Sequence, residues 1–535
     1  MRLAGVFLFL AASLAAQDAA KDAANTEPDD APPASIPSRQ RPVTVVDAVD
    51  LALAYNIGLE SDRLGVLIAR LRVDEEEAAW DTVFNSGIGG GEDRIPSRTE
   101  LAGADVLDTD RFQFNFGIEK QLPIGPTLGV KWRTDRTFNN SSFSTINPAY
   151  DSAFEFTISV PLWRGRGREV TQVELRAERH AMESARQDLM AEVATLLTDV
   201  GKAYWELVNR QERVTVLEKS LEVAREIEAS ERKKLRPEVG RSTIIDVTKA
   251  EAETQRRIAE LIAGRRDAAD AADALREMIL PFTGQKDLDE LVFVAIDEPQ
   301  TDVVAGLLDD RLATAMASRP ELRAQDALIA RLQEFVVQAR DAVSPELNLA
   351  GVVTSRGVAG AFDSSAQDVL DGDAVSASGE LNLSFPFGRR AAKAALRRSE
   401  LELERARLQR RELSNGIIAE VRRAHRAVST AGDEIRATTK EVESAEVALA
   451  GERRRLDRGT STVINVVRLE EDLTLARIRS LEARIGLERA RLELLRVEGT
   501  ILQRFSVGID EELRARRAVG PFKSAEPAGD VPGSS

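Results

Sequence analysis

The sequence predicts a mainly helical fold with membrane β-strands, in which long coiled-coil helical hairpins occur twice. Three observations support this prediction. Short motifs recur in the same order along the chain, long segments keep heptad spacing, and shorter stretches alternate apolar and polar residues. Charged residues make up 30% of the 535 residues and aromatic residues only 5%, a composition that suits long helices.

The chain begins with a segment that we expect to be a secretory signal peptide, residues 1–15. Arg2 supplies its positive charge, and the run from Leu3 to Leu14 is apolar. This run is too short to cross a bilayer as a helix, and no later stretch approaches ~18 apolar residues. Residues 16–42 and 517–535 are polar, and we expect them to be disordered. The mature chain is therefore expected to be exported, with any membrane span built from strands.

An internal duplication organises the rest of the chain. Three motifs occur twice in the same order: Leu-Ile-Ala-Arg-Leu at 67–71 and 328–332, a strand-like stretch ending at Pro161 and Pro386, and a Gly-x-Ser-Thr-x-Ile-x-Val turn beginning at Gly240 and Gly459. Three ordered matches indicate two repeats. The offset between them falls from 261 to 225 residues between the first and second motifs, so the first repeat carries about 36 additional residues there.

Each repeat is expected to contain the same series of elements. In repeat 1 (43–285) these are helices over 43–80, strands over about 82–163, a long helix over 168–236 and a returning helix over 243–280. In repeat 2 (303–503) they are helices over 303–343, strands over about 346–387, a long helix over 390–458 and a returning helix over 462–502. Ser242 and Ser461 are the expected N-caps of the returning helices.

The long helices have the spacing of coiled coils. Ile417, Val421, Ala424 and Val428 alternate steps of four and three residues, which defines an a/d seam, and the first repeat has a similar series. A helix of about 68 residues extends roughly 100 Å. The heptads alone fit an ordinary coiled coil, which would not account for the strands.

The strand-like stretches alternate strictly. In Arg111–Glu119, Phe112, Phe114 and Phe116 fall on one face, while polar residues fall on the other. Alternating segments of about ten residues are typical of outer-membrane barrel strands, although a half-buried soluble sheet has the same period. We interpret 91–110 and 137–152 as long polar loops. One chain offers about four to six strands, too few to close a barrel, so we expect a homo-oligomer that pools them.

Composition and charge exclude several other functions. The formal net charge of −16 argues against a nucleic-acid partner. The chain has no cysteine and two histidines, His180 and His425, so thiolate and multi-histidine metal sites are not expected. Acidic residues recur beside Arg and Lys on helix faces, as in 400–411, which is typical of solvated ion pairs. No cofactor or metal is expected, and no catalytic residues are identified.

Taken together, these motifs resemble the TolC-like outer-membrane efflux protein family. The resemblance covers about 43–502 and rests on the duplication, the strands ending at Pro161 and Pro386, and the turns at Gly240 and Gly459. It implies a homotrimer in the outer membrane that extends into the periplasm. The strands would form a shared β-barrel in contact with outer-membrane lipid, and the helices an α-barrel tunnel. The tips would dock on a periplasmic adaptor (membrane fusion protein) and, through it, on an inner-membrane pump of an efflux or type I secretion system.

The resemblance also implies where the tip contacts and the gate lie. The implied residues are Gly240, Arg241, Ser242, Asp246, Arg455, Arg458, Gly459, Thr460, Asn465 and Arg468. Asp246 matches an acid of the family's closing network, whereas Leu456, Ser461, Asn465 and Arg468 depart from the residues found there. We therefore hypothesise that Asp246 pairs with Arg455, Arg458 or Arg468.

Two alternatives remain at this point. The family usually has four strands per protomer and twelve per trimer, but the additional segment of repeat 1 predicts a hairpin, Arg111–Leu122 with Thr127–Asp135, which would give six and eighteen. The alternative function is a periplasmic coiled-coil adaptor or scaffold. An adaptor would have one helical hairpin and a soluble β-domain, so two complete repeats favour the channel.

Overall fold

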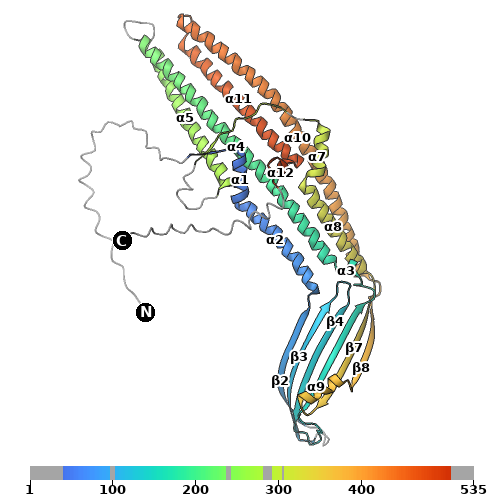
Figure 1. The fold of residues 1–535 in the computed structure, drawn as a ribbon. Helices are drawn as coiled ribbons and strands as arrows, with labels where there is room; N and C mark the ends of the chain where they lie inside the picture. The colour runs from blue at the N-terminus through green and yellow to red at the C-terminus, as the bar shows by residue number, and fades with distance from the viewer. Residues whose placement is uncertain (1–39, 97–102, 236–242, 281–291, 304–305, 508–535) are drawn as a thin grey trace, which may run out of the picture.

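The computed structural model describes residues 40–96, 103–235, 243–280, 292–303 and 306–507. The molecule is elongated, with a bundle of long helices at one end and a twisted sheet at the other (Figure 1). This arrangement confirms the predicted mainly helical fold with long hairpins and strands in both repeats. The predicted signal peptide and the tail at 517–535 lie outside the described residues.

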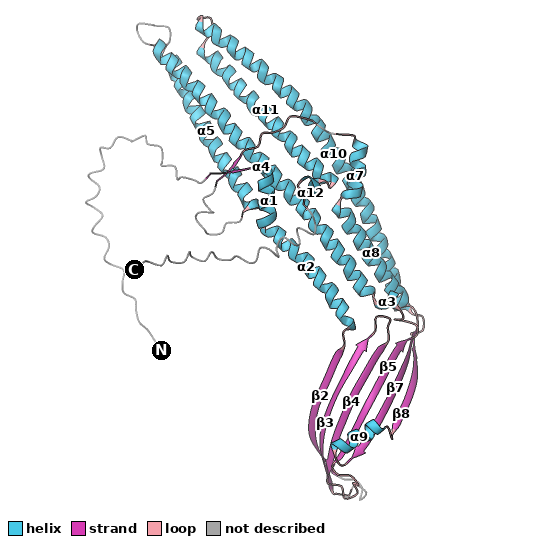
Figure 2. Ribbon diagram, in the orientation of Figure 1, coloured by secondary structure: helices cyan, strands magenta, loops and turns pink. Residues whose placement is uncertain are grey.

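Two long helical hairpins form the bundle. The first pairs α4 (Val173–Lys234) with α5 (Ile244–Ile279), and the second pairs α10 (Arg390–Asp457) with α11 (Val463–Glu498). The returning helices are continued toward the sheet by α2 (Ile57–Glu77) and α8 (Pro320–Asp341), so that two shorter helices run beside each long one (Figure 2). The shorter helical elements are α1 (Val45–Tyr55), η1 (Ala78–Trp80), α3 (Arg168–Thr171), α7 (Leu308–Ser318) and α12 (Ile501–Arg504).

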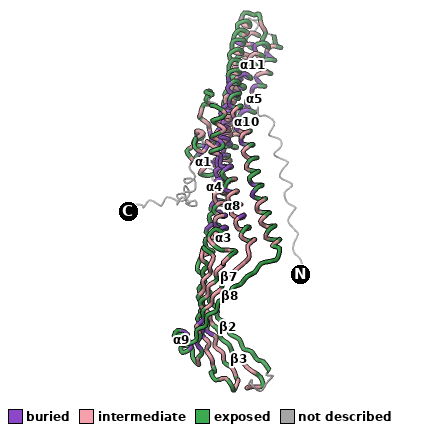
Figure 3. Tube along the Cα trace, turned by 90° about the vertical axis from the view of Figure 1, so that its right-hand side faces the viewer, coloured by how far each residue is buried: buried purple, intermediate pink, exposed green. Residues whose placement is uncertain are grey.

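The helices lie side by side in a curved layer. Near the sheet their order is α2, α4, α8 and α10, and toward the tips it is α5, α4, α11 and α10. Buried residues concentrate in this layer (Figure 3). Ile417, Val421 and Val428 of α10 are at most 1% exposed, as the heptad spacing predicted. In the first repeat, α4 buries Leu197 and Val200 in the same way.

A six-stranded antiparallel sheet forms the other end. Its order is β2 (Val83–Pro96), β3 (Val106–Gln121), β4 (Thr127–Asn139), β5 (Ala149–Pro161), β7 (Glu346–Ala359) and β8 (Val375–Ser384). The sheet contains the predicted additional hairpin as β3 and β4, each longer than expected at its loop end. Strands of the two repeats meet where β5 pairs with β7, for example Phe156 opposite Val353.

Three expectations about loops and segments are corrected. The loop predicted at 91–110 is largely strand, because the glycines at 89–91 pair opposite 111–113 of β3 instead of turning the chain. The loop at 137–152 is likewise shortened by β4 and β5. A helix, α9 (Phe362–Asp371), lies between β7 and β8, where only strands were expected.

The segment 16–42 is not disordered throughout. Residues 40–42 belong to β1 (Gln40–Val43), which pairs in parallel with β6 (Val292–Ala295). This small sheet is fixed by a distant partner, since the Tyr204 hydroxyl of α4 lies 3.1 Å from the Val43 carbonyl and 2.8 Å from the Asp297 carboxylate. Residues 16–39 lie outside the described residues.

The ends of the returning helices also differ from expectation. Thr243 and Thr462 are the N-caps, one residue after the serines expected there. In α5 the reason is a capping box, in which Thr243 and Asp246 bond to each other's backbone N–H groups. The second returning helix ends at Glu498, since Gly499 has φ 71° and closes it as a left-handed C-cap.

Candidate functional site

The two faces of the sheet have opposite character. Because the register is continuous from β2 to β8, side chains opposite one another share a face. One face carries mostly apolar residues: Phe84, Ile88, Phe112, Phe114, Phe116, Ile118, Leu128, Val130, Trp132, Phe154, Phe156, Ile158, Val353, Leu381 and Leu383. The other carries mostly polar ones, including Gln113, Asn115, Glu119, Lys131, Arg133, Glu155, Thr157, Asn382 and Glu380.

The apolar face is largely uncovered within one chain. Phe116 is 46% exposed and Leu381 is 61% exposed, although both are large apolar side chains. A continuous exposed apolar surface of this kind marks contact with lipid or protein. Apolar and polar faces that alternate along long antiparallel strands are typical of membrane barrels, with the polar face toward the lumen. None of the described helices is both long and apolar enough to cross a bilayer.

Helix α9 covers the apolar face near its loop end. Ser365 of α9 is completely buried, and its hydroxyl lies 2.9 Å from that of Ser152, which in turn lies 2.9 Å from that of Thr134. Gly357 of β7 makes this approach possible, because a Cβ there would come within 2.2 Å of the Ser365 carbonyl oxygen. The helix therefore buries a polar patch that would interrupt the apolar surface.

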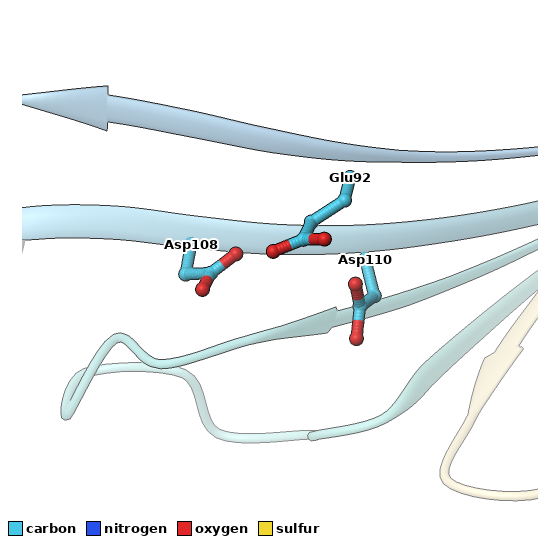
Figure 4. A group of neighbouring side chains, drawn as sticks. All are labelled: Glu92, Asp108 and Asp110. Carbon is cyan, nitrogen blue, oxygen red and sulfur yellow. The ribbon is translucent and has the colours of Figure 1, made fainter.

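Beyond α9 the same face becomes charged. Glu92 of β2 and Asp108 and Asp110 of β3 lie with their carboxylates within 4.8 Å of one another (Figure 4). Arg94 contacts both Glu92 and Asp108, the latter at 3.2 Å. The cluster is thus an ion-pair group at the end of the apolar band. Sequence reasoning assigned Glu92 and Asp108 to a loop and did not identify it.

The lateral edges of the chain are open. The sheet ends at β2 on one side and at β8 on the other, and all ten residues of β8 are exposed. The helices above continue these edges, with α2 on the β2 side and α10 on the β8 side (Figure 1). An uncovered strand edge favours pairing with another chain.

Apolar side chains point outward from both helical edges. On α2, Leu64, Leu67, Ile68 and Leu71 are 47–59% exposed and share helical spacing. On α10, Leu401 and Leu408 are 53% and 52% exposed, seven residues apart. Each edge thus has an apolar stripe of its own, and the two stripes lie on opposite sides of the molecule.

The tip of the second hairpin is a tight turn. Gly459 has φ 77°, and the Thr460 backbone N–H donates to the Arg455 carbonyl at 2.9 Å. The Arg455 guanidinium pairs with Glu452 at 3.1 Å, and the Ser461 hydroxyl also donates to Glu452. These contacts occupy Arg455 within its own hairpin. Gly240, Arg241 and Ser242, the predicted tip residues of the first hairpin, lie outside the described residues.

The side chain of Asp246 is held by the N-cap residue of its own helix, α5. Its carboxylate accepts hydrogen bonds from the Thr243 hydroxyl, at 2.6 Å, and from the Thr243 backbone N–H, and these bonds lower the pKa of Asp246 below 3.8. Within the described tip of a single chain, no ion pair joins it to Arg455, Arg458 or Arg468. Asn465, Arg458 and Arg468 are exposed. The pairing of Asp246 with one of these arginines stays a prediction for an assembly.

The chain is similar in sequence and in fold to known outer-membrane channel proteins. The model of the family described as outer membrane efflux protein matches residues 123–279 and 312–500. The solved outer-membrane channel OprN is 17% identical, with a TM-score of 0.63 over 85% of this chain and 90% of that one. CmeC of Campylobacter jejuni is 15% identical, with a TM-score of 0.63 over 88% and 89%. VceC of Vibrio cholerae is 16% identical, with a TM-score of 0.61 over 85% and 96%. The comparison with curated proteins gives no match.

Proposed function

Because this chain belongs to the outer membrane efflux protein family, we propose that three copies form the exit duct of a tripartite efflux or type I secretion machine. Family membership assigns an efflux-channel role in the outer membrane. We propose in addition that the channel is passive and does not itself supply the energy for transport. Substrate would enter from a periplasmic adaptor, driven by an inner-membrane pump, and would leave through the barrel.

The observation that carries this proposal is the two-faced sheet with two open edges. The six strands alternate in direction, so β2 and β8 run antiparallel to each other. Copies placed side by side can therefore continue an antiparallel sheet from β8 of one to β2 of the next. Such a head-to-tail interface forms a ring when the rotation closes. The ring removes every free edge, turns the apolar face to lipid and encloses the polar face.

The helical edges support the same arrangement. Leu67 lies ten residues before the sheet-side end of α2, and Leu401 lies eleven residues after the sheet-side start of α10. Both are therefore about 15 Å from the sheet. A neighbouring copy that joins β8 to β2 brings these levels together, so the apolar stripes of α2 and α10 cover each other. The layer of helices would then close into a periplasmic tunnel.

The tips are suited to docking a protein partner. Ile244 and Ile245, in the first turn of α5, are 65% and 60% exposed, and Ile464 of α11 is 50% exposed. Exposed isoleucines on both hairpins, together with the charged and polar tip residues Arg458 and Asn465 of the second, give the tips a mixed surface that a periplasmic adaptor can bind. We propose Gly459, Thr460 and Arg468 as further members of this contact.

Cysteine crosslinking tests the ring directly, because the chain has no cysteine of its own. Leu67→Cys combined with Leu401→Cys should link copies into covalent trimers in outer-membrane fractions. Leu67→Cys with Val428→Cys is the matched control, because Val428 is buried within its own chain. A monomer in the soluble periplasmic fraction, without crosslinks, would refute the channel and favour the adaptor.

The tip contact needs a separate experiment. Thr460→Cys carrying a photoactivatable crosslinker should capture a co-produced periplasmic adaptor, whereas Thr215→Cys, exposed midway along α4, should not. Capture at Thr215 but not at Thr460 would contradict docking at the tips.

A further inference from the structure

The β3–β4 hairpin has no counterpart among the described residues of the second repeat. In both repeats the first strand follows a short helix, with β2 after α2 and β7 after α8. The last strand in both precedes a long helix, with β5 before α4 and β8 before α10. Between them repeat 1 inserts two complete strands, whereas repeat 2 has α9. The duplicated unit therefore contains two strands, and β3 and β4 are an addition.

The added hairpin is integrated into the sheet. It pairs along its whole length with β2 on one side and β5 on the other, so that Phe84, Ile118, Val130 and Phe156 form one cross-strand row. Its apolar residues lie on the same face as those of the neighbouring strands. The rings of Phe116 and Trp132 are stacked at 6.5 Å across the hairpin. A hairpin folded over a barrel mouth would have neither the two-sided register nor this shared face.

We propose that β3 and β4 belong to the barrel wall, so that the assembled channel has an eighteen-stranded barrel that passes bulky polar solutes. This inference rests on the proposed trimer. Eighteen strands differ from the twelve that are usual in the family, and the wider barrel bears on the size of the cargo.

The additional strands change the width of the duct. Strands about 4.8 Å apart and tilted by about 40° give a backbone radius of about 12 Å for twelve strands and about 18 Å for eighteen. The enclosed cross-section thus rises about 2.2-fold. A ring of twelve helices spaced about 8–10 Å apart has a radius of about 15–19 Å. The eighteen-stranded barrel therefore continues the helical tunnel without narrowing.

The hairpin changes the size of the lumen more than its charge. Its polar face carries three basic residues, Arg111, Lys131 and Arg133, and two acidic ones, Glu119 and Asp135. Arg133 and Asp135 pair at 3.1 Å. The added wall is nearly balanced in charge, so it provides no strong preference for anions or cations. A wide, water-filled and nearly neutral wall favours selection by size.

A lumen-facing cysteine measures the width from outside. Ser159 lies on the polar face at the helix-side end of β5, opposite Thr127 and Ala350. A polymer added outside must cross the whole barrel to reach Ser159→Cys. Intact cells with the trimer in their outer membrane are treated with polyethylene glycol maleimides of graded size. The lipid-facing Val160→Cys is the control, and it should not react with any of them.

The comparison is with a chain that lacks the hairpin. Replacing residues 97–148 by an Asn-Gly turn joins β2 directly to β5 and leaves four strands. The largest polymer that labels Ser159→Cys should then decrease by roughly 6 Å in radius. An equal size limit in the two assembled trimers would overturn the inference.

If the shortened chain does not assemble, disulfide formation between cysteines introduced into the full-length chain tests the same inference. Asn85→Cys on β2 and Glu155→Cys on β5 are separated by β3 and β4, about 14 Å apart, which is too far for a disulfide. The directly opposed pair Lys131→Cys and Glu155→Cys should form one. A disulfide between positions 85 and 155 in the trimer would show that β2 adjoins β5, and would refute the wide barrel. A narrow trimeric channel contradicts only this inference, whereas failure to form any outer-membrane oligomer contradicts the proposed function.

Discussion

A charge placed on the apolar face of the sheet tests which face meets lipid. Phe156 lies on that face of β5, between Val130 on β4 and Val353 on β7. The apolar residues of this face run from Phe154 to Val160, so Phe156 lies one residue, or about 3 Å, from the centre of the run. Phe156 is 37% exposed, because none of the described residues covers it completely. We expect Phe156→Arg to place a guanidinium near the middle of the bilayer.

The expected cost is large. Arginine at the midplane of a membrane barrel costs about 2–4 kcal/mol per site, and three copies give about 6–12 kcal/mol per trimer. Thr157→Arg is the matched control, because Thr157 is the next residue and points to the polar face. Its neighbours across the strands are Gly129 on β4, which has no side chain, and the uncharged Val352 on β7. We expect this control to change stability by less than about 1 kcal/mol.

The assay is reversible urea unfolding in lipid vesicles, followed by tryptophan fluorescence. Trp132 is a suitable reporter, since it lies on the apolar face opposite Phe154. The unfolding free energy should fall for Phe156→Arg and stay near the parent value for Thr157→Arg. Equal losses for the two variants, or a loss confined to Thr157→Arg, would refute the assignment of the faces.

Four further perturbations follow from individual contacts. Tyr204→Phe removes a buried hydroxyl and leaves Asp297 with one partner fewer, so thermal unfolding should show a loss of about 1–3 kcal/mol. Thr243→Ala should destabilise the first turn of α5 by about 1 kcal/mol, as measured by amide hydrogen exchange. Because the bonds from Thr243 lower the pKa of Asp246, the stability that the Asp246 carboxylate contributes is present above pH about 4. It is lost as the pH falls through the lowered pKa. Asp246→Ala should alter conductance and adaptor-dependent export, and unchanged values would exclude it from the gate. Gly357→Val should displace α9, which faster protease cleavage of the outer loops on intact cells would reveal.

Part of the candidate site could be predicted from local sequence. The alternation in Arg111–Glu119 defines the apolar face, because successive side chains of any strand point to opposite sides. The glycines at 89–91 misled the prediction, since a run of glycines is typical of a loop and only pairing with β3 makes it a strand. The acidic cluster of Glu92 and Asp108 was missed for the same reason.

The duplication, the long helices and the two-faced strands could be predicted from the residues alone, because each is a periodicity carried by neighbouring residues. The place of the added hairpin inside the sheet, the edges at β2 and β8, and the polar patch under α9 became known only from the folded chain. The parallel pairing of β1 with β6 likewise joins residues more than 250 positions apart. Such contacts depend on which distant segments meet, and hydrophobic period does not specify a partner. The number of strands that pair in one sheet, which sets the width of any barrel they form, therefore came from the fold.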